Sequence, residues 1–137
     1  MSDTVPTVVR FLNPASMPPS FGYTQVVEVT GSKMVYLAGQ IAFDLAGNVV
    51  GAGDLRAQTQ QVFENLKAGL AAAGATFEHV VKLQLFLLDI TQIQIVRDVR
   101  DRYINTQFPP ASTAVEVRRL FRDELLIEID AIAALPR

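Results

Sequence analysis

The sequence predicts a single α+β domain in which a mixed sheet carries two helices on one face. Three observations support this fold class. Runs rich in β-branched and aromatic residues alternate with two helical patterns in the order β, β, β, α, β, α, β, β. The chain has 137 residues, the usual length of one domain, and 50% of them are hydrophobic, enough for one core. No repeat or linker-like tract divides it, so we expect one domain over residues 1–137.

Three strands are predicted before the first helix. Residues 8–12 form a short β-rich run, and the Pro- and Gly-containing loop that follows cannot be helical. Residues 25–30 and 33–38 are two further β-rich runs joined at Gly31-Ser32, which suggests a β-hairpin. Residues 44–48 contain Asp, Gly and Asn and are expected to form a turn.

The first predicted helix begins after Asp54, a residue type that caps helices, and ends before Gly74. Six residues recur at helical spacing and are expected to form its inward face: Leu55, Thr59, Val62, Phe63, Leu66 and Leu70. A strand over residues 80–88 follows, with Val81, Leu83, Leu85 and Leu87 on one face and Lys82, Gln84 and Phe86 on the other.

A second helix is expected over about residues 91–103. Its inward positions are Ile93, Val96, Val99 and Tyr103, and charges of alternating sign, Arg97, Asp98, Arg100, Asp101 and Arg102, are expected to face solvent. Two last strands over 113–118 and 125–133 flank a basic loop. Because both helices would cover one face of the sheet and the last strand is apolar on both sides, the opposite face is expected to associate with a partner.

Composition excludes several classes of function. The formal charge is -2 and the pI is about 5.3, and the clustered cations are confined to Arg118, Arg119 and Arg122, so we expect no nucleic-acid partner. Cysteine is absent, which removes disulfides and thiolate catalysis, and the lone His79 argues against a metal site. We expect no cofactor. No apolar run is long enough to span a bilayer, so a cytoplasmic protein without a membrane partner is expected.

Several short motifs occur in a fixed order along the chain. Residues 108–117 read Phe-Pro-Pro-Ala-Ser-Thr-Ala-Val-Glu-Val, a Pro turn that enters a strand bearing one acid. Earlier segments read Gly-Tyr-Thr-Gln at 22–25 and Leu-Ala-Gly-Gln-Ile at 37–41, and a later one reads Ile-Glu-Ile-Asp-Ala at 127–131. Together with the helix at 57–67, this order resembles the reactive-intermediate deaminase family, also called RidA, YjgF or endoribonuclease L-PSP.

This resemblance implies a chorismate-mutase-like (YjgF-type) fold and a homotrimer with small-molecule clefts between neighbouring chains. The family signature reads roughly Pro-Ala-Arg-Ser/Thr-x-Val-Glu-Val, and its arginine binds the substrate carboxylate. Here Ser112 occupies the arginine position, and Ala114 stands where many relatives carry cysteine. The chain therefore resembles an arginine-lacking member, in which deaminase activity on 2-imino acids is expected to be weak.

Glu128 and Tyr23 are the predicted catalytic residues. Glu128 stands at the family's glutamate position in an apolar run, where it would orient or deprotonate a water that attacks an imine carbon; the alternative is a partly solvated carboxylate paired with an arginine. Tyr23 follows a Pro-rich loop and would cover the ligand, unless its ring only packs. Gly39 and Gln40 would supply backbone and amide contacts, although such a pair also marks β-bulges.

Ser112 and Thr113 are predicted to bind the polar end of the substrate as hydrogen-bond donors, because the sequence offers no histidine beside them to make a nucleophile. Ala114 would line the same cleft. Arg100 has two interpretations, a cation that replaces the missing arginine or a solvated residue of the helix surface, in pairs such as Arg97 with Asp101.

The predicted function is hydrolysis of a small imine, enamine or related amine or amide at a subunit-interface cleft. The alternative is a trimeric protein that binds or protects a small molecule without turning it over.

Overall fold

The computed structural model describes residues 6–137. Its strands and helices follow the predicted order, with short 3-10 turns η1 and η2 before β4 and α2. The elements are β1 (Val8–Leu12), β2 (Val26–Thr30), β3 (Ser32–Gln40), α1 (Leu55–Ala72), η1 (Phe77–His79), β4 (Val80–Leu87), η2 (Ile90–Gln92), α2 (Ile93–Arg100), β5 (Ala111–Glu116) and β6 (Ile127–Pro136).

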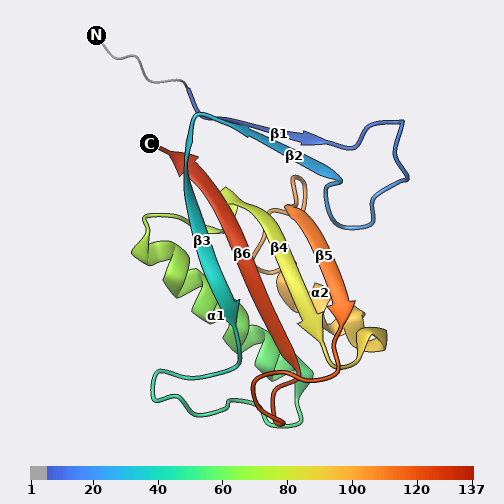
Figure 1. Cartoon of the computed structure of the whole chain (residues 1–137), viewed down its shortest axis with the longest axis vertical. Coiled ribbons are helices and arrows are strands. Elements are labelled where there is room, and N and C mark those ends of the chain that lie inside the picture. Colours follow the sequence, from blue (N-terminus) through green and yellow to red (C-terminus); the bar gives the residue numbers. More distant parts are fainter. Residues whose placement is uncertain (1–5) are drawn as a thin grey trace.

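In the described part of the chain, the main sheet has four strands in the order β3-β6-β4-β5. Strand β6 is antiparallel to β3 and β4, whereas β4 and β5 run parallel. Figure 1 shows α1 and α2 on the same face of this sheet, and the other face carries no helix in the described residues. The predicted α+β class with a mixed sheet is confirmed. We call the uncovered side the open face.

The predicted hairpin between β2 and β3 is wrong. Strand β2 pairs with β1, from Val8 opposite Thr30 onward, whereas β3 pairs with β6, from Ser32 opposite Pro136 onward. Gly31 is the lone residue between β2 and β3 and has φ +66°. One residue is too short for the two-residue loop of a tight hairpin, so the chain bends at Gly31 and enters a different sheet.

Helix α1 matches its prediction. The Asp54 carboxylate accepts a hydrogen bond from the Ala57 amide at 3.1 Å and caps the first turn. Gly74 follows the helix with φ +76°, a conformation that ends helices. All six residues of the predicted inward face are buried.

Helix α2 is shorter than predicted, and its surface was partly misassigned. Val96 and Val99 are buried as expected, but Arg100 is also buried, with a side chain that is 7% exposed. Asp101, which was predicted to pair with Arg97, instead forms an ion pair with Arg100, at 2.9 Å. The reason is helical spacing. Arg100 lies seven residues after Ile93, two turns along α2, so both residues lie on the side of the helix that faces β5.

Tyr103 lies beyond the end of α2 and packs inward as predicted. Its ring stacks on Phe63 with centroids 5.1 Å apart, and its hydroxyl donates to Glu64 at 2.7 Å. Burial, followed by the hydrogen bond to Glu64, raises the pKa of Tyr103 to about 12. The phenol therefore stays protonated and remains a donor across the physiological pH range.

A buried amide in α1 fastens two loops at one end of the sheet. Gln58 is fully buried, and its Nε2 donates to the carbonyls of Gly51 at 3.1 Å and Glu124 at 2.8 Å. Its Oε1 accepts from the Leu126 amide at 2.8 Å. The sequence pattern did not identify this residue, since a glutamine on a helix is usually solvated.

We expect Gln58→Leu to lower the free energy of unfolding by roughly 2 to 4 kcal/mol, because the shape is kept while three loop groups lose their partner. Urea unfolding measures this change. Gln60→Leu makes the same substitution at an exposed position of the same helix and should change stability by less than about 1 kcal/mol. Equal effects of the two variants would contradict the assigned role of Gln58.

Candidate functional site

A cavity of about 250 Å³ lies between α2 and β5, and we call it the α2–β5 cavity. It brings together four residues that the sequence singled out, Tyr23, Arg100, Ser112 and Ala114. The rest of its lining comes from Leu85, Ile93 and Arg97. Apart from Tyr23, the lining belongs to regular elements, so its geometry is set by the sheet and by α2.

Strand alternation explains the wall formed by β5. In the parallel register, Ser112 lies opposite Leu83 and Ala114 opposite Leu85, so both small residues share the face that α2 covers. Serine and alanine leave space where larger side chains would fill the gap to the helix. The α2 wall is formed by Ile93, Arg97 and Arg100, which lie at spacings of four and seven residues on one side of the helix.

The loop before β2 is fastened beside the cavity. The Thr24 amide donates to the Pro110 carbonyl at 3.2 Å, and the Thr24 hydroxyl donates to the Pro109 carbonyl. Thr24 is 1% exposed. These bonds hold Tyr23 over the strand that carries Ser112. Sequence reasoning missed Thr24, although its position directly after Tyr23 and the paired prolines before Ser112 contained the signal.

Arg100 supplies a buried positive charge at the cavity. Its Nε and Nη2 donate to one oxygen of Asp101 at 3.0 and 2.9 Å, and that carboxylate is 47% exposed. The guanidinium also lies against the backbone of Gly22: a Cβ at that position would be 3.1 Å from Arg100 Nη2. Arg97 adds a second, partly exposed guanidinium to the same wall. The sequence pattern predicted that Arg97 faces solvent, and it allowed two interpretations of Arg100, a cation of the cleft or a solvated residue of the helix surface.

Glu128 and Gly39 form a separate group on the open face. Glu128 lies opposite Phe86 in the register of β4 and β6, and β3 has an irregular register between Leu37 and Gln40. Gly39 lies in this irregularity, and a Cβ there would be 2.8 Å from Glu128 Cδ. Because the φ of Gly39 is not positive, the absent side chain serves close approach rather than an unusual backbone conformation.

Thr113 points to the open face, opposite to its neighbour Ser112, as strand alternation requires. Its hydroxyl accepts a hydrogen bond from Lys82 Nζ at 2.9 Å. Nearby, Gln84 Nε2 donates to Asp130 at 3.1 Å in its favourable amide orientation. Burial raises the pKa of Asp130, and the positive charge of Lys82 opposes this shift. Ser112 and Thr113 of one chain therefore cannot bind the same ligand atom.

Gln40 lies away from both groups. Its side chain donates to the Ala38 carbonyl at 3.1 Å, and it lines a groove of about 440 Å³ between β3 and α1 together with Asn65 and Gly69. This position agrees with the alternative that the Gly39-Gln40 pair marks a bulge, which the register shift confirms.

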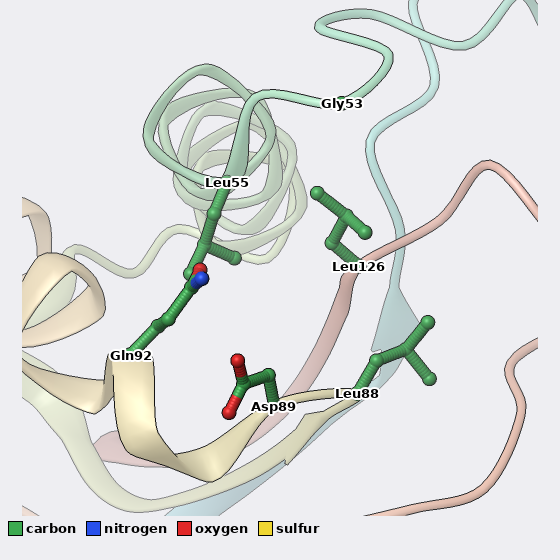
Figure 2. Close-up of a pocket in the computed structure, with 6 residues that line it drawn as sticks. All are labelled: Gly53, Leu55, Leu88, Asp89, Gln92 and Leu126. Carbon is green, nitrogen blue, oxygen red and sulfur yellow. The ribbon is translucent and has the colours of Figure 1, made fainter.

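A further cavity of about 240 Å³ lies where β4 ends, and Figure 2 shows Asp89 and Gln92 facing Leu55 and Leu126 across it. None of the predicted site residues lines it. Asp89 Oδ1 accepts hydrogen bonds from the amide and the hydroxyl of Thr91, so this carboxylate caps η2. The cavity therefore has an acid with a structural role.

The described residues offer little for other kinds of site. Within residues 6–137, His, Asp and Glu side chains nowhere gather in a group of three or more that could hold a metal ion. Neither helix in that range has the length and apolar character needed to cross a membrane.

The predicted site is thus divided between the two faces of one sheet. The α2–β5 cavity contains a hydroxyl, a phenol and two guanidinium groups, which can bind and orient an anionic or polar ligand. The carboxylate of Glu128, which can accept and return protons, lies on the open face. In a single chain these functions are separated by the sheet.

Comparisons with known proteins give a consistent result. A family model described as endoribonuclease L-PSP matches residues 14–135. Protein DfrA of Myxococcus xanthus is 46% identical over 111 residues, covering 81% of this chain and 83% of the relative. The 2-iminobutanoate/2-iminopropanoate deaminase of Dermatophagoides farinae is 33% identical over 122 residues, covering 89% and 92%. The solved structure of YyfB, a Rid-family protein of unknown function from Yersinia pestis, has a TM-score of 0.81 at 36% identity, covering 93% of this chain and 98% of that one.

We expect Gly39→Ala to displace the Glu128 carboxylate while changing the free energy of unfolding by less than about 1 kcal/mol, because the crowded atoms belong to the flexible end of a side chain. A crystal structure of the variant and its thermal unfolding measure the two effects. In a Glu128→Ala background the same change should have no further effect. An unmoved carboxylate in Gly39→Ala would contradict the close approach.

Proposed function

Because this chain belongs to the endoribonuclease L-PSP family, which includes Rid and RutC proteins, we propose that it is a hydrolase that deaminates a small imine or enamine. The observation that carries this proposal is the α2–β5 cavity, in which Tyr23, Ser112 and Arg100 surround a space suited to a small polar molecule. The relative from Dermatophagoides farinae named as an imino-acid deaminase supports the reaction type.

The proposed reaction adds water across a carbon–nitrogen double bond. Glu128 takes a proton from the water as its oxygen bonds to the imine carbon, and passes that proton to the nitrogen, which gives a carbinolamine. Glu128 then moves the hydroxyl proton of the carbinolamine to the amino nitrogen, the carbon–nitrogen bond breaks, and ammonia leaves as the carbonyl forms. An imine and one water thus become a carbonyl compound and ammonia, so the reaction requires no cofactor. Tyr23 would cover the ligand and exclude bulk water.

This chemistry requires Glu128 near the cavity, and a second copy of the chain can supply it. The open face exposes Met34 at 40%, Tyr36 at 72% and Val115 at 40%, more apolar surface than a sheet face normally leaves to water. We propose a homotrimer in which the open face of one chain meets the β5 edge of the next. Each interface cleft would then join Ser112 and Tyr23 of one chain to Glu128 and Gly39 of its neighbour.

Ser112 restricts the substrate. A hydroxyl there cannot form the paired, charge-assisted bonds that a guanidinium makes with a carboxylate. We therefore propose a substrate that lacks a carboxylate or whose carboxylate is held by another wall of the cavity.

A trimer that binds or protects a small molecule without turnover is the second candidate. It is favoured by the separation of Glu128 from Ser112 within one chain, because the cavity can bind a ligand without the acid. Ammonia release from freshly generated imines supports the hydrolase, whereas thermal stabilisation by a ligand without product supports the binding protein.

We expect Glu128→Gln to reduce kcat/KM for imine hydrolysis by roughly 100- to 10,000-fold, the usual contribution of a general acid–base group, while ligand binding is retained. Initial rates of ammonia release at imine concentrations well below KM measure the loss. The matched control is Glu28→Gln, at an exposed glutamate of β2 that pairs with Arg10 of β1. This variant should keep full activity. Hydrolysis at the native rate by Glu128→Gln would remove Glu128 from the mechanism.

We expect the protein to sediment with three times the mass of its 15.0 kDa chain. Tyr36→Glu should dissociate the trimer, because it introduces a charge into the proposed interface. Phe121→Glu changes an equally exposed aromatic residue in the loop between β5 and β6 and should leave the assembly intact.

An interface site also allows complementation. Chains carrying Glu128→Gln and chains carrying Ser112→Trp, each inactive alone, should regain activity when refolded together, since some clefts then combine two intact halves. A stable native monomer, or failure of mixed trimers to regain activity, would argue against the interface cleft.

A further inference from the structure

We infer that Arg100, assisted by Arg97, holds the anionic end of the substrate on the helix wall of the α2–β5 cavity. Anion recognition would then come from α2, across the cavity from Ser112 on β5. This inference rests on the proposed function, in that the same cavity receives the substrate, and it identifies the residues that select it.

Burial of Arg100 is the first observation. A guanidinium that is 7% exposed loses most of its hydration. This loss is strongly unfavourable unless its N–H groups find acceptors and an opposite charge lies beside it. Asp101 compensates the guanidinium only in part, because a single oxygen of its half-exposed carboxylate accepts both hydrogen bonds. A bound anion would supply the rest of the opposite charge, and it could reach Arg100 through the α2–β5 cavity.

The free donors of Arg100 point to the same conclusion. Within residues 6–137 its hydrogen bonds use Nε and Nη2, and Nη1 donates to no protein acceptor. No side-chain nitrogen or oxygen in that range is both shut off from solvent and without a partner. Nη1 therefore reaches solvent, and the α2–β5 cavity is the space that Arg100 lines. An incoming carboxylate can accept from Nη1 there, beside the Ser112 hydroxyl.

The charge of the cavity supports an anion. Its lining includes Arg97 and Arg100 and contains no acidic residue. Even with the Asp101 carboxylate counted, one positive charge is left over. A monoanion would neutralise it.

The helix dipole gives a structural explanation of these cations. The last turn of a helix favours positive charge, and both arginines lie in the last turn of α2. That preference accounts for the sign of the charge but not for burial, since Arg102 follows the same helix and remains exposed. Gly22, against which Arg100 Nη2 lies, directly precedes Tyr23, so the cation is held under the loop that would cover the ligand.

The rest of the cavity limits the size of the substrate. Leu85, Ile93 and Ala114 provide apolar surface, and a volume of about 250 Å³ equals the space of roughly eight waters. A small carboxylate with a short aliphatic chain matches both features: the carboxylate meets α2 and the chain lies on Leu85. The inferred ligand is a small aliphatic carboxylate bound through α2.

The test compares binding of 2-oxobutanoate, a small aliphatic carboxylate, with binding of its neutral amide. Isothermal titration calorimetry of the assembled protein should show tighter binding of the anion by roughly 10- to 100-fold, the effect of one charge-assisted guanidinium pair. Arg100→Met should abolish this difference. Arg102→Met, which removes an exposed cation just past the same helix, should leave it unchanged.

Relocating the guanidinium makes the test more specific. Ser112→Arg combined with Arg100→Met should restore preference for the anion, whereas Ser112→Arg alone adds a third cation to the cavity and should not increase that preference. If Arg100→Met does not fold, the Arg100 Hε–Nε resonance of the native protein answers the same question, since it should shift on titration with 2-oxobutanoate and not with the amide.

The outcomes separate this inference from the proposed function. Anion-selective binding without ammonia release supports the inference and contradicts the hydrolase. Imine hydrolysis that is equally fast for neutral and anionic substrates, and unaffected by Arg100→Met, supports the hydrolase and overturns the inference. Equal affinity for 2-oxobutanoate and its amide, or no binding of either, also overturns it.

Discussion

The parallel pairing of β4 with β5 is the constraint on which the rest of the site depends. Antiparallel neighbours can be joined by a tight turn, but parallel strands need a crossover that returns the chain to the same end of the sheet. Here η2 and α2 form that crossover, so α2 must lie across β5. Handedness places it on the face that α1 also covers, as Figure 1 shows. The cavity arises because β5 carries Ser112 and Ala114 toward this helix.

The period of a strand then decides which functional groups can meet. Neighbouring residues point to opposite faces, so Ser112 enters the cavity while Thr113 bonds to Lys82 on the open face. Glu128 lies on that open face as well. A sheet is a barrier between its two faces, and groups on both sides can act on one ligand only at an edge, where a second chain can bring the missing face. Association would therefore be part of the chemistry rather than an addition to it.

The sequence predicted most of the fold, since period-two and helical patterns are strong in β4 and α1. It failed where tertiary contacts overrode local pattern. The apparent hairpin at Gly31 is broken because β6, distant in sequence, pairs with β3. Solvent exposure was one of two interpretations of Arg100, because alternating charges are typical of an exposed helix, whereas its burial was determined by the position of β5. Thr24 and Gln58 were missed, because their hydrogen-bond partners are backbone groups far along the chain.

The central place of β6 in the sheet has a consequence for how the protein is made. This strand, residues Ile127–Pro136, lies between β3 and β4, so neither has its main neighbour until the ribosome has passed residue 136. During synthesis α1 can form early, but the apolar sides of β3 and β4 stay exposed, and closure over such a long sequence separation is slow. The nascent chain would therefore expose these apolar strand faces until β6 has been made, and pairing of β6 with both neighbours would complete the sheet.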